Sequence, residues 1–216
     1  KEAFENAIFV ASAIGASSNC PPHLTAIARH MGIDLPIDSW EKLGHDIPLL
    51  VNCQPAGEHL MEGFFKAGGV PAIMQELMKN NKLHKSVMTV TGKTVEKNLN
   101  IKIEVDENVI KSFKNPLVEN AGFIVMKSNF FSSAVMKTSV ISKEFRKRYL
   151  SNPNNPNIFE ARAVVFEGPE DYHKRINDEN LKIDENSILM IRGCGPVGYP
   201  GSAEVVNMQP PDKLLK

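Results

Sequence analysis

Apolar residues recur at the spacing of an α-helix through the first third of the chain. This pattern predicts helices at residues 4–14, 24–31, 39–43, 58–67 and 70–77. Glycine follows several of these segments, as expected where a helix ends. A short, wholly apolar run at residues 49–51 predicts a buried strand of the kind found in parallel α/β sheets. We therefore expect residues 1–83 to have α/β character.

The pattern changes near Asn80 and Asn81, where strand-length runs rich in valine, isoleucine and threonine take over. These runs are separated by turn residues. They lie at residues 87–90, 101–105, 122–126, 134–140, 161–166 and 187–191. We therefore expect a domain boundary near residue 83. An α/β segment at residues 1–83 would be followed by a β-rich, barrel-like domain at residues 84–216.

The charge balance excludes several kinds of partner. The chain carries 25 Lys and Arg residues against 25 Asp and Glu residues, and it has no basic stripe. We therefore expect no nucleic-acid partner. A small basic cluster at residues 143–148 is interpreted as a solvated helix face, with a phosphate-binding patch as the less favoured alternative.

No apolar run is long enough to span a bilayer, so no membrane association is expected.

The three cysteines are widely spaced and form no Cys-x-x-Cys pair; they are Cys20, Cys53 and Cys194. This spacing supports neither a disulfide framework nor a self-contained zinc or iron–sulfur site, and it fits a reducing cytoplasm. The chain begins at Lys1, inside a helical pattern, and its last residues resemble the start of another helix. We expect it to be part of a longer protein.

A glycine-rich stretch at residues 191–208 holds a single acidic residue, Glu204. Its four glycines let the backbone take unusual angles and let other groups approach closely. A lone carboxylate after such a turn is a candidate hard-metal ligand or general base. It is equally suited to the first turn of a short helix at residues 202–208, which the helix dipole favours. Residue types alone favour the helix interpretation.

A second candidate site lies where the loop after residue 14 enters the next helix. Its candidate binding residues are Ser17, Ser18, Asn19 and His23. Backbone N–H groups at a helix start, with these side chains around them, suit an anion or a polyol hydroxyl. An ordinary helix cap explains the same residues equally well.

Two further motifs are weak. His59 and Glu62 have the spacing of helix-borne metal ligands, but a lone pair of this kind is more often a solvated helix face. The sequence Thr-Gly-Lys-Thr at residues 91–94 is similar to the end of a phosphate-binding P-loop. Val87 stands where that loop needs its first glycine, which excludes a P-loop nucleoside triphosphatase.

Several segments, in order, resemble the dihydroxy-acid and sugar-acid dehydratase family. The resemblance begins with Gly-Ala-Ser-Ser-Asn at residues 15–19 and continues almost to the end of the chain. The other matching segments are residues 48–50, 55–57, 64–71, 89–94, 137–138 and 163–169. The variants at residues 21–23 and 195–208 are more similar to the sugar-acid (aldonate) branch than to the branched-chain amino-acid branch.

The resemblance implies a hydro-lyase that dehydrates a sugar acid, as a 2,3-dihydroxy acid, to a 2-keto-3-deoxy acid. Members of the family use an iron–sulfur cluster and Mg²⁺, with an α/β domain that carries the cluster and a β-barrel domain that caps it. A serine alkoxide takes the C2 proton, and the enol product becomes the keto acid. The same resemblance implies a cytoplasmic homo-oligomer with a small sugar acid as its partner.

Little of that machinery maps onto this chain. The cluster cysteines and most magnesium ligands correspond to positions before Lys1, and the serine to a position after Lys216. Glu204 is the one metal ligand that the resemblance assigns here, while Ser17, Ser18, Asn19 and His23 are implied to line the substrate site. The resemblance implies that neither Cys20 nor Cys194 is a cluster ligand. Residues 127–133 depart from the family pattern, which leaves the local turn and the substrate preference open.

Residues 1–216 alone are therefore expected to bind no cluster and to be inactive. Two alternatives stay open at this point. One is a dihydroxy-acid dehydratase of branched-chain amino-acid synthesis. The other is a non-catalytic module in which the glycine-rich stretch serves packing or assembly.

Overall fold

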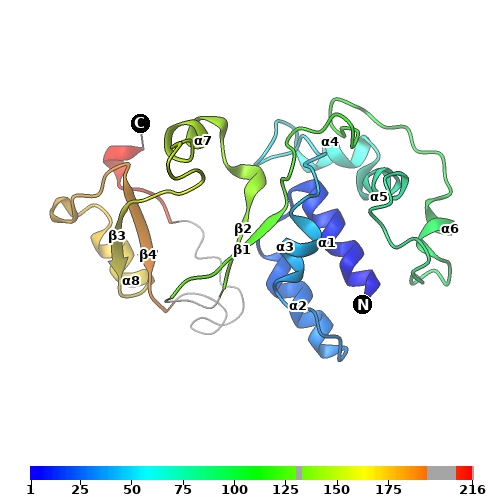
Figure 1. Cartoon of the computed structure of the whole chain (residues 1–216), viewed down its shortest axis with the longest axis horizontal. Coiled ribbons are helices and arrows are strands. Elements are labelled where there is room, and N and C mark those ends of the chain that lie inside the picture. Colours follow the sequence, from blue (N-terminus) through cyan, green and yellow to red (C-terminus); the bar gives the residue numbers. More distant parts are fainter. Residues whose placement is uncertain (130–132, 194–207, 216) are drawn as a thin grey trace. The chain divides into compact units, whose positions relative to one another are not determined.

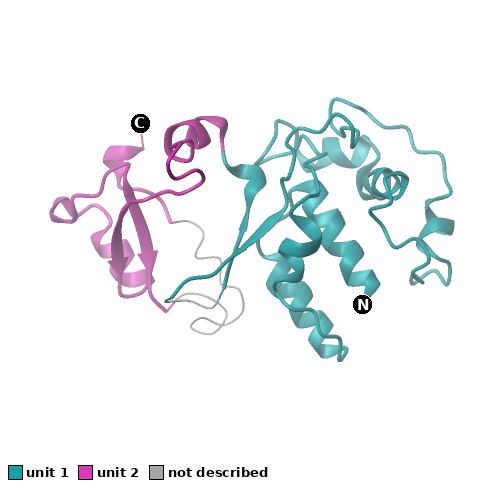
Figure 2. Cartoon of the chain, in the orientation of Figure 1, with its two compact units in different colours: residues 1–141 teal, residues 142–216 magenta. Residues whose placement is uncertain are grey.

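The computed structural model describes residues 1–129, 133–193 and 208–215 (Figure 1). The chain divides into two compact units, Lys1–Ile141 and Ser142–Lys216 (Figure 2). Each unit has a buried apolar core of its own. The boundary predicted near residue 83 falls inside unit 1. The division into these units tests neither that domain boundary nor the predicted barrel, so both remain predictions.

Unit 1 begins with helices, as the apolar spacing predicted. Their bounds are α1 Glu2–Ile14, α2 Cys20–His30, α3 Ser39–Gly44, α4 Met61–Lys66, α5 Gly69–Lys79 and α6 Val95–Leu99. The predicted helices are confirmed, with ends that differ by a few residues. Helix α6 lies in the region predicted to be rich in strands. The Thr94 hydroxyl caps it by accepting a 3.3 Å hydrogen bond from the Lys97 N–H.

Four of the predicted strands are present. They are β1 Phe123–Met126, β2 Ala134–Lys137, β3 Arg162–Phe166 and β4 Ser187–Ile191. The strand predictions at residues 87–90 and 101–105 are wrong. The first segment contributes only an isolated bridge between Met88 and Thr94, and the second pairs with no strand among the described residues.

The prediction of a parallel strand at residues 49–51 is also wrong. These residues form isolated antiparallel bridges, Leu49 with Val118 and Val51 with Ile110. The Leu50 N–H donates to the Ala13 carbonyl at the end of α1, over 2.8 Å. The segment is fully buried, as its composition indicated, but its hydrogen-bond partners come from loops and a helix end instead of a sheet.

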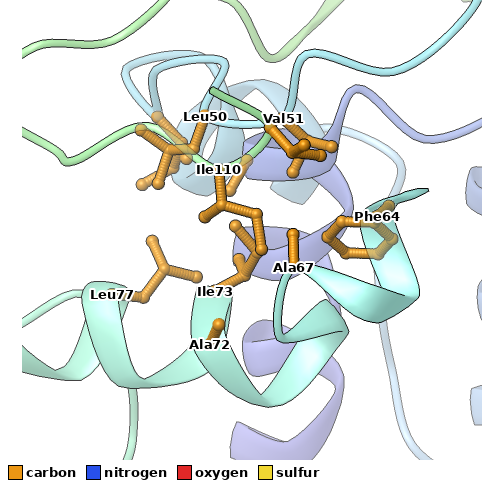
Figure 3. Close-up of a cluster of buried hydrophobic side chains, with 11 residues drawn as sticks. Leu50, Val51, Phe64, Ala67, Ala72, Ile73, Leu77 and Ile110 are labelled. Atoms are coloured by element: carbon orange, nitrogen blue, oxygen red, sulfur yellow. The ribbon is translucent and has the colours of Figure 1, made fainter. Parts of the chain in front are cut away.

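One core cluster of unit 1 gathers around this segment (Figure 3). Side chains from the region of α4 and from α5 face Leu50, Val51 and Ile110. Ile73 and Leu77, four residues apart on α5, are completely buried in it. Because Leu50 is tied to the end of α1, this packing fixes that end of the helix.

A second cluster places strands β1 and β2, which pair antiparallel with Phe123 opposite Lys137. Phe123 and Trp40 of α3 are both fully buried, and their rings meet edge to face with centroids 4.9 Å apart. Gly122 lies against the Gly44 backbone so closely that a Cβ atom would overlap the Gly44 carbonyl. The strand pair is therefore locked onto α3.

Unit 2 pairs β3 and β4 in parallel, with Arg162 opposite Ser187. Its helices are α7 Lys143–Tyr149 and α8 Pro169–Arg175. Short 3₁₀ helices lie at η2 Glu179–Leu181 and η3 Asp212–Leu214, and η1 Thr138–Val140 follows β2 in unit 1. Phe166 and Tyr172 form the centre of the unit 2 core, with ring centroids 5.4 Å apart. The basic cluster at residues 143–148 lies on α7, which has no buried residue, as expected for a solvated helix.

Candidate functional site

A pocket of about 420 Å³ lies within unit 1, in the size range of small-molecule sites. We call it the α1-turn pocket because the turn after α1 forms one wall. Its lining residues are Ile14, Gly15, Ala16, Ser17, Ser18, Val51, Cys53, Gln54, Pro55, Met61, Phe64 and Lys137. The wall is apolar where it meets the core and carries hydroxyl, amide and ammonium groups elsewhere.

The first wall depends on Gly15, which ends α1 in the left-handed conformation, with φ of 63°. Its N–H donates to the Ser12 carbonyl at 3.1 Å, and the next N–H, of Ala16, donates to the Ala11 carbonyl at 2.9 Å. A Cβ atom on Gly15 would lie 2.9 Å from the Leu49 Cδ1. Glycine is therefore required here, both for the backbone angle and for the space beside Leu49.

The serines of this turn lead into α2. The Ser17 Oγ accepts a hydrogen bond from the Asn19 N–H at 3.2 Å, and the Ser17 carbonyl accepts one from the Cys20 N–H at 3.0 Å. Ser17 and Ser18 line the α1-turn pocket, whereas Asn19 and His23 do not. His23 is exposed in the first turn of α2. Of the four residues proposed from the sequence to bind substrate, the structure thus brings two into one pocket.

The second wall is the loop at residues 51–55, which local hydrogen bonds hold in place. The Asn52 side-chain oxygen accepts from the Glu58 N–H at 2.9 Å. The Gln54 N–H donates to the His59 carbonyl at 2.8 Å, and the Gln54–Pro55 peptide bond is cis. These bonds present Cys53, Gln54 and Pro55 to the pocket.

Lys137, the last residue of β2, supplies the charge of the pocket. Its Nζ donates a 3.1 Å hydrogen bond to the Gly15 carbonyl. Desolvation by burial lowers the pKa of Lys137, and Coulombic attraction to the thiolate form of Cys20 partly offsets this effect. Burial in turn raises the pKa of Cys20, against the influence of Lys137. Cys20 is therefore a neutral thiol near pH 7, and it supplies no negative charge to the lysine.

The pocket joins four of the segments on which the family resemblance depends. Residues 15–18 come from the first matching segment, Pro55 from the segment at 55–57, Phe64 from the segment at 64–71, and Lys137 from the segment at 137–138. Sequence reasoning did not select Lys137, Cys53 or Gln54 as site residues. The order of matching motifs was the signal that could have found Lys137, since motifs far apart in a chain often meet at one site.

The segment that contains Glu204 lies outside the described residues, as does Cys194. The residues on either side are attached to the unit 2 core. The Arg192 N–H donates to the Phe166 carbonyl at 2.9 Å. The Tyr172 hydroxyl donates to the Gln209 carbonyl at 2.8 Å and accepts from the Gln209 N–H at 2.6 Å. The described residues on either side of this segment therefore contact β3 and α8.

Two other expectations concern metals and membranes. Among residues 1–129, 133–193 and 208–215, no group of three or more His, Cys, Asp or Glu side chains is placed to hold a metal ion. Glu62 forms an exposed ion pair with Lys66 at 2.6 Å, which fits the solvated-face interpretation of the His59–Glu62 motif. None of the helices in the part of the chain that the structure describes has the length and apolar character to cross a membrane.

Comparison with known proteins finds two family matches that together span most of the sequence. Residues 1–98 match the family model described as dihydroxy-acid/6-phosphogluconate dehydratase, N-terminal, and residues 108–216 match its C-terminal counterpart. The chain is 57% identical, over its whole length, to D-xylonate dehydratase of Caulobacter vibrioides. It is 43% identical over its whole length to L-arabinonate dehydratase of Rhizobium leguminosarum. It is 34% identical over 95% of its length to dihydroxy-acid dehydratase of Ignicoccus hospitalis.

The chain spans only about a third of these relatives, 36% of the first two and 35% of the third. The match to the first family model ends at residue 98, and the match to the second begins at residue 108.

Proposed function

Because this chain belongs to the dihydroxy-acid/6-phosphogluconate dehydratase family, we propose that the whole protein dehydrates a sugar acid to a 2-keto-3-deoxy acid. The observation that carries this proposal is the gradient of identity. Identity is 57% and 43% with the relatives named for D-xylonate and L-arabinonate, and 34% with one named for dihydroxy acids. Such a gradient supports an aldonate substrate over a branched-chain one.

The chemistry of the α1-turn pocket supports the same choice. Its lining residues include Ser17, Ser18 and Gln54, whose side chains carry hydroxyl and amide groups, and Lys137, whose side chain carries an ammonium. A sugar acid carries hydroxyl groups along its chain that such donors and acceptors would satisfy. A branched-chain dihydroxy acid has methyl groups in their place, and these would leave polar groups of the site without partners, at a cost in affinity.

The family resemblance supports an iron–sulfur cluster and Mg²⁺ as cofactors of the whole protein. When bound, they would supply Lewis-acid activation of the departing hydroxyl and of the substrate carboxylate. The described residues offer no group of three ligands for either cofactor. We therefore propose that this chain contributes Glu204 to the magnesium site and that the other ligands belong to other parts of the longer protein. The chain alone would then be inactive.

The test is a substrate comparison with the purified whole protein. Formation of the 2-keto acid would be measured with D-xylonate, L-arabinonate and 2,3-dihydroxyisovalerate at equal concentrations. We expect at least one sugar acid to be turned over with a higher kcat/KM than dihydroxyisovalerate. Preference for dihydroxyisovalerate would instead assign the protein to branched-chain synthesis. Absence of turnover with all three, in protein loaded with cluster and Mg²⁺, would contradict the proposed activity.

We also propose that the whole protein is a homo-oligomer, as the family resemblance implies. Light scattering coupled to size-exclusion chromatography would measure its mass in solution. A monomeric mass at micromolar concentration would contradict this proposal.

A further inference from the structure

Among the described residues, the lining of the α1-turn pocket includes a positively charged residue and no negatively charged one. Lys137 is the charged side chain among the described residues that line the pocket, and these include no Asp or Glu. The nearby Cys20 thiol is neutral near pH 7, because burial raises its pKa. A half-buried ammonium without a counter-ion is energetically unfavourable, and an anion bound in the pocket would stabilise it.

Lys137 is held so that its ammonium can meet a ligand. The backbone of β2 is fixed by its register with β1, and the next residue, Thr138, donates its N–H to the Gly122 carbonyl at 3.0 Å. Within the described part of the chain, the Nζ makes one hydrogen bond, to the Gly15 carbonyl. An ammonium has three N–H donors, so two remain for a ligand in the pocket.

The neighbouring groups define the kind of anion. The pocket holds about 420 Å³, enough for a small organic acid. Ser17, Ser18 and Gln54 line the same pocket and carry neutral hydrogen-bonding groups. This combination suits a hydroxy-carboxylate better than inorganic phosphate, which is usually held by several cationic or backbone donors.

We infer that Lys137 is a substrate-binding residue whose ammonium pairs with the carboxylate of the sugar acid in the α1-turn pocket. The inference rests on the proposed function, since it takes the sugar acid as the ligand. A carboxylate has two oxygens and about four acceptor sites, so pairing with Lys137 is compatible with a second cation on the same group. The bond from Lys137 to the Gly15 carbonyl would hold the ammonium in place during binding.

Kinetics of the whole protein provide the first test. Lys137→Met removes the charge and keeps a stem of similar length, whereas Lys137→Arg keeps a positive charge. The control is Lys127→Met, because Lys127 is exposed, lies just after β1 and pairs with Asp38 at 3.0 Å, away from the pocket lining. We expect Lys137→Met to raise the KM for D-xylonate by about tenfold to a hundredfold, the usual cost of losing a charged hydrogen bond. The Lys127→Met and wild-type values should agree within about twofold, and Lys137→Arg should recover part of the loss.

A purely structural role for Lys137 would give a different result. Lys137→Met would then lower the melting temperature and the amount of active enzyme, while the KM of the remaining enzyme stayed at the wild-type value. That outcome would overturn the inference. If the wild-type protein turned over no sugar acid at all, the proposed function itself would fail, so the two failures are distinguishable.

Lysine labelling of the wild-type protein needs no variant and covers the case in which Lys137→Met does not fold. Acetylation of Lys137 and Lys127 would be followed by mass spectrometry with excess D-xylonate, with excess xylitol and without ligand. Xylitol has the same hydroxyl-bearing chain but no carboxylate. We expect D-xylonate to slow acetylation of Lys137 at least several-fold, and neither compound to protect Lys127. Equal labelling of Lys137 with and without D-xylonate, or equal protection by xylitol, would overturn the inference.

Discussion

The Lys137 Nζ donates a 3.1 Å hydrogen bond to the Gly15 carbonyl, 122 residues earlier in the chain. This bond joins the end of β2 to the turn that follows α1, and both sides of it line the α1-turn pocket. The strand pair is locked onto α3 through Gly122, and the turn is held beside Leu49 through Gly15. The position of the ammonium is therefore set by two independent parts of the unit 1 core.

The conformation of Gly15 gives a prediction about stability. Gly15→Ala should destabilise unit 1 by about 2–4 kcal/mol, because a left-handed backbone angle costs about 1–2 kcal/mol and overlap with Leu49 adds to it. The matched control is Gly32→Ala, which has a similar φ of 69° but open space around the added methyl group. Its cost should be the backbone term alone, about 1–2 kcal/mol. Chemical denaturation of the whole protein, with hydrogen exchange to localise the change, would measure both, and equal costs would contradict the proposed overlap.

The edge-to-face pair of Phe123 and Trp40 leads to a second prediction. Phe123→Ala should lower the free energy of unfolding by about 3–5 kcal/mol, since it removes a fully buried ring and leaves a cavity beside Trp40. It should also weaken D-xylonate binding, because Phe123 is the register partner of Lys137. Phe65→Ala is the control, since Phe65 is 79% exposed and its removal should change stability by less than about 0.5 kcal/mol. If Phe123→Ala left the affinity for D-xylonate unchanged, the position of Lys137 would not depend on the strand pair.

The lowered pKa of Lys137 predicts how ligand affinity depends on pH. A bound carboxylate stabilises the ammonium and therefore raises the pKa of Lys137 in the complex above its value in the free protein. Between these two pKa values, the free lysine is largely deprotonated, so binding of the carboxylate is accompanied by uptake of a proton. Affinity for D-xylonate should be flat below the free-state pKa. It should fall by up to about tenfold per pH unit above it, until the pKa of the complex is reached.

Calorimetric titration of the whole protein from pH 7 to pH 10 would measure this dependence. Lys137→Met should remove it. Cys20 is the neighbour that influences the pKa of Lys137, and Cys53 lines the same pocket, so Cys20→Ser and Cys53→Ser are the controls and should keep the fall in affinity. A pH dependence that disappeared in a cysteine variant, and persisted in Lys137→Met, would assign the titration to the thiol.

The proposed metal ligand gives a fourth prediction. Glu204→Gln in the whole protein should abolish sugar-acid dehydration and lower the magnesium content, because an amide oxygen carries no charge to balance the ion. Glu185→Gln is the control, since Glu185 is a half-exposed carboxylate of unit 2 that pairs with Arg148. Turnover and bound metal would be measured on the same preparations. Retained turnover in Glu204→Gln would remove Glu204 from the site.

The local elements of this protein followed from its sequence because their causes are local. The spacing of Ile73 and Leu77 predicted α5, and their complete burial on one face confirms the reason. The runs predicted at residues 161–166 and 187–191 became β3 and β4 for a similarly local reason, their strand-forming composition. The ordered motifs indicated the family, which the matches at residues 1–98 and 108–216 confirm.

The same reasoning failed where an apolar run could find more than one kind of partner. Leu49 and Val51 were predicted to join a parallel sheet, and they bridge instead to Val118 and Ile110. Composition indicates that such a run is buried, but it does not identify the backbone groups that will satisfy its hydrogen bonds. Those partners are more than fifty residues away along the chain, as the register of each bridge shows.

The sequence by itself therefore determined the first five helices, four strands, the family and the candidate loop at Ser17 and Ser18. Only the tertiary structure decided that Lys137 joins that loop in one pocket, while His23 is exposed on α2 and does not line the pocket. The physical reason is that a pocket is made by non-local packing. The turn at Gly15 and the end of β2 meet because Leu50 ties one to the core and the ring of Phe123 ties the other.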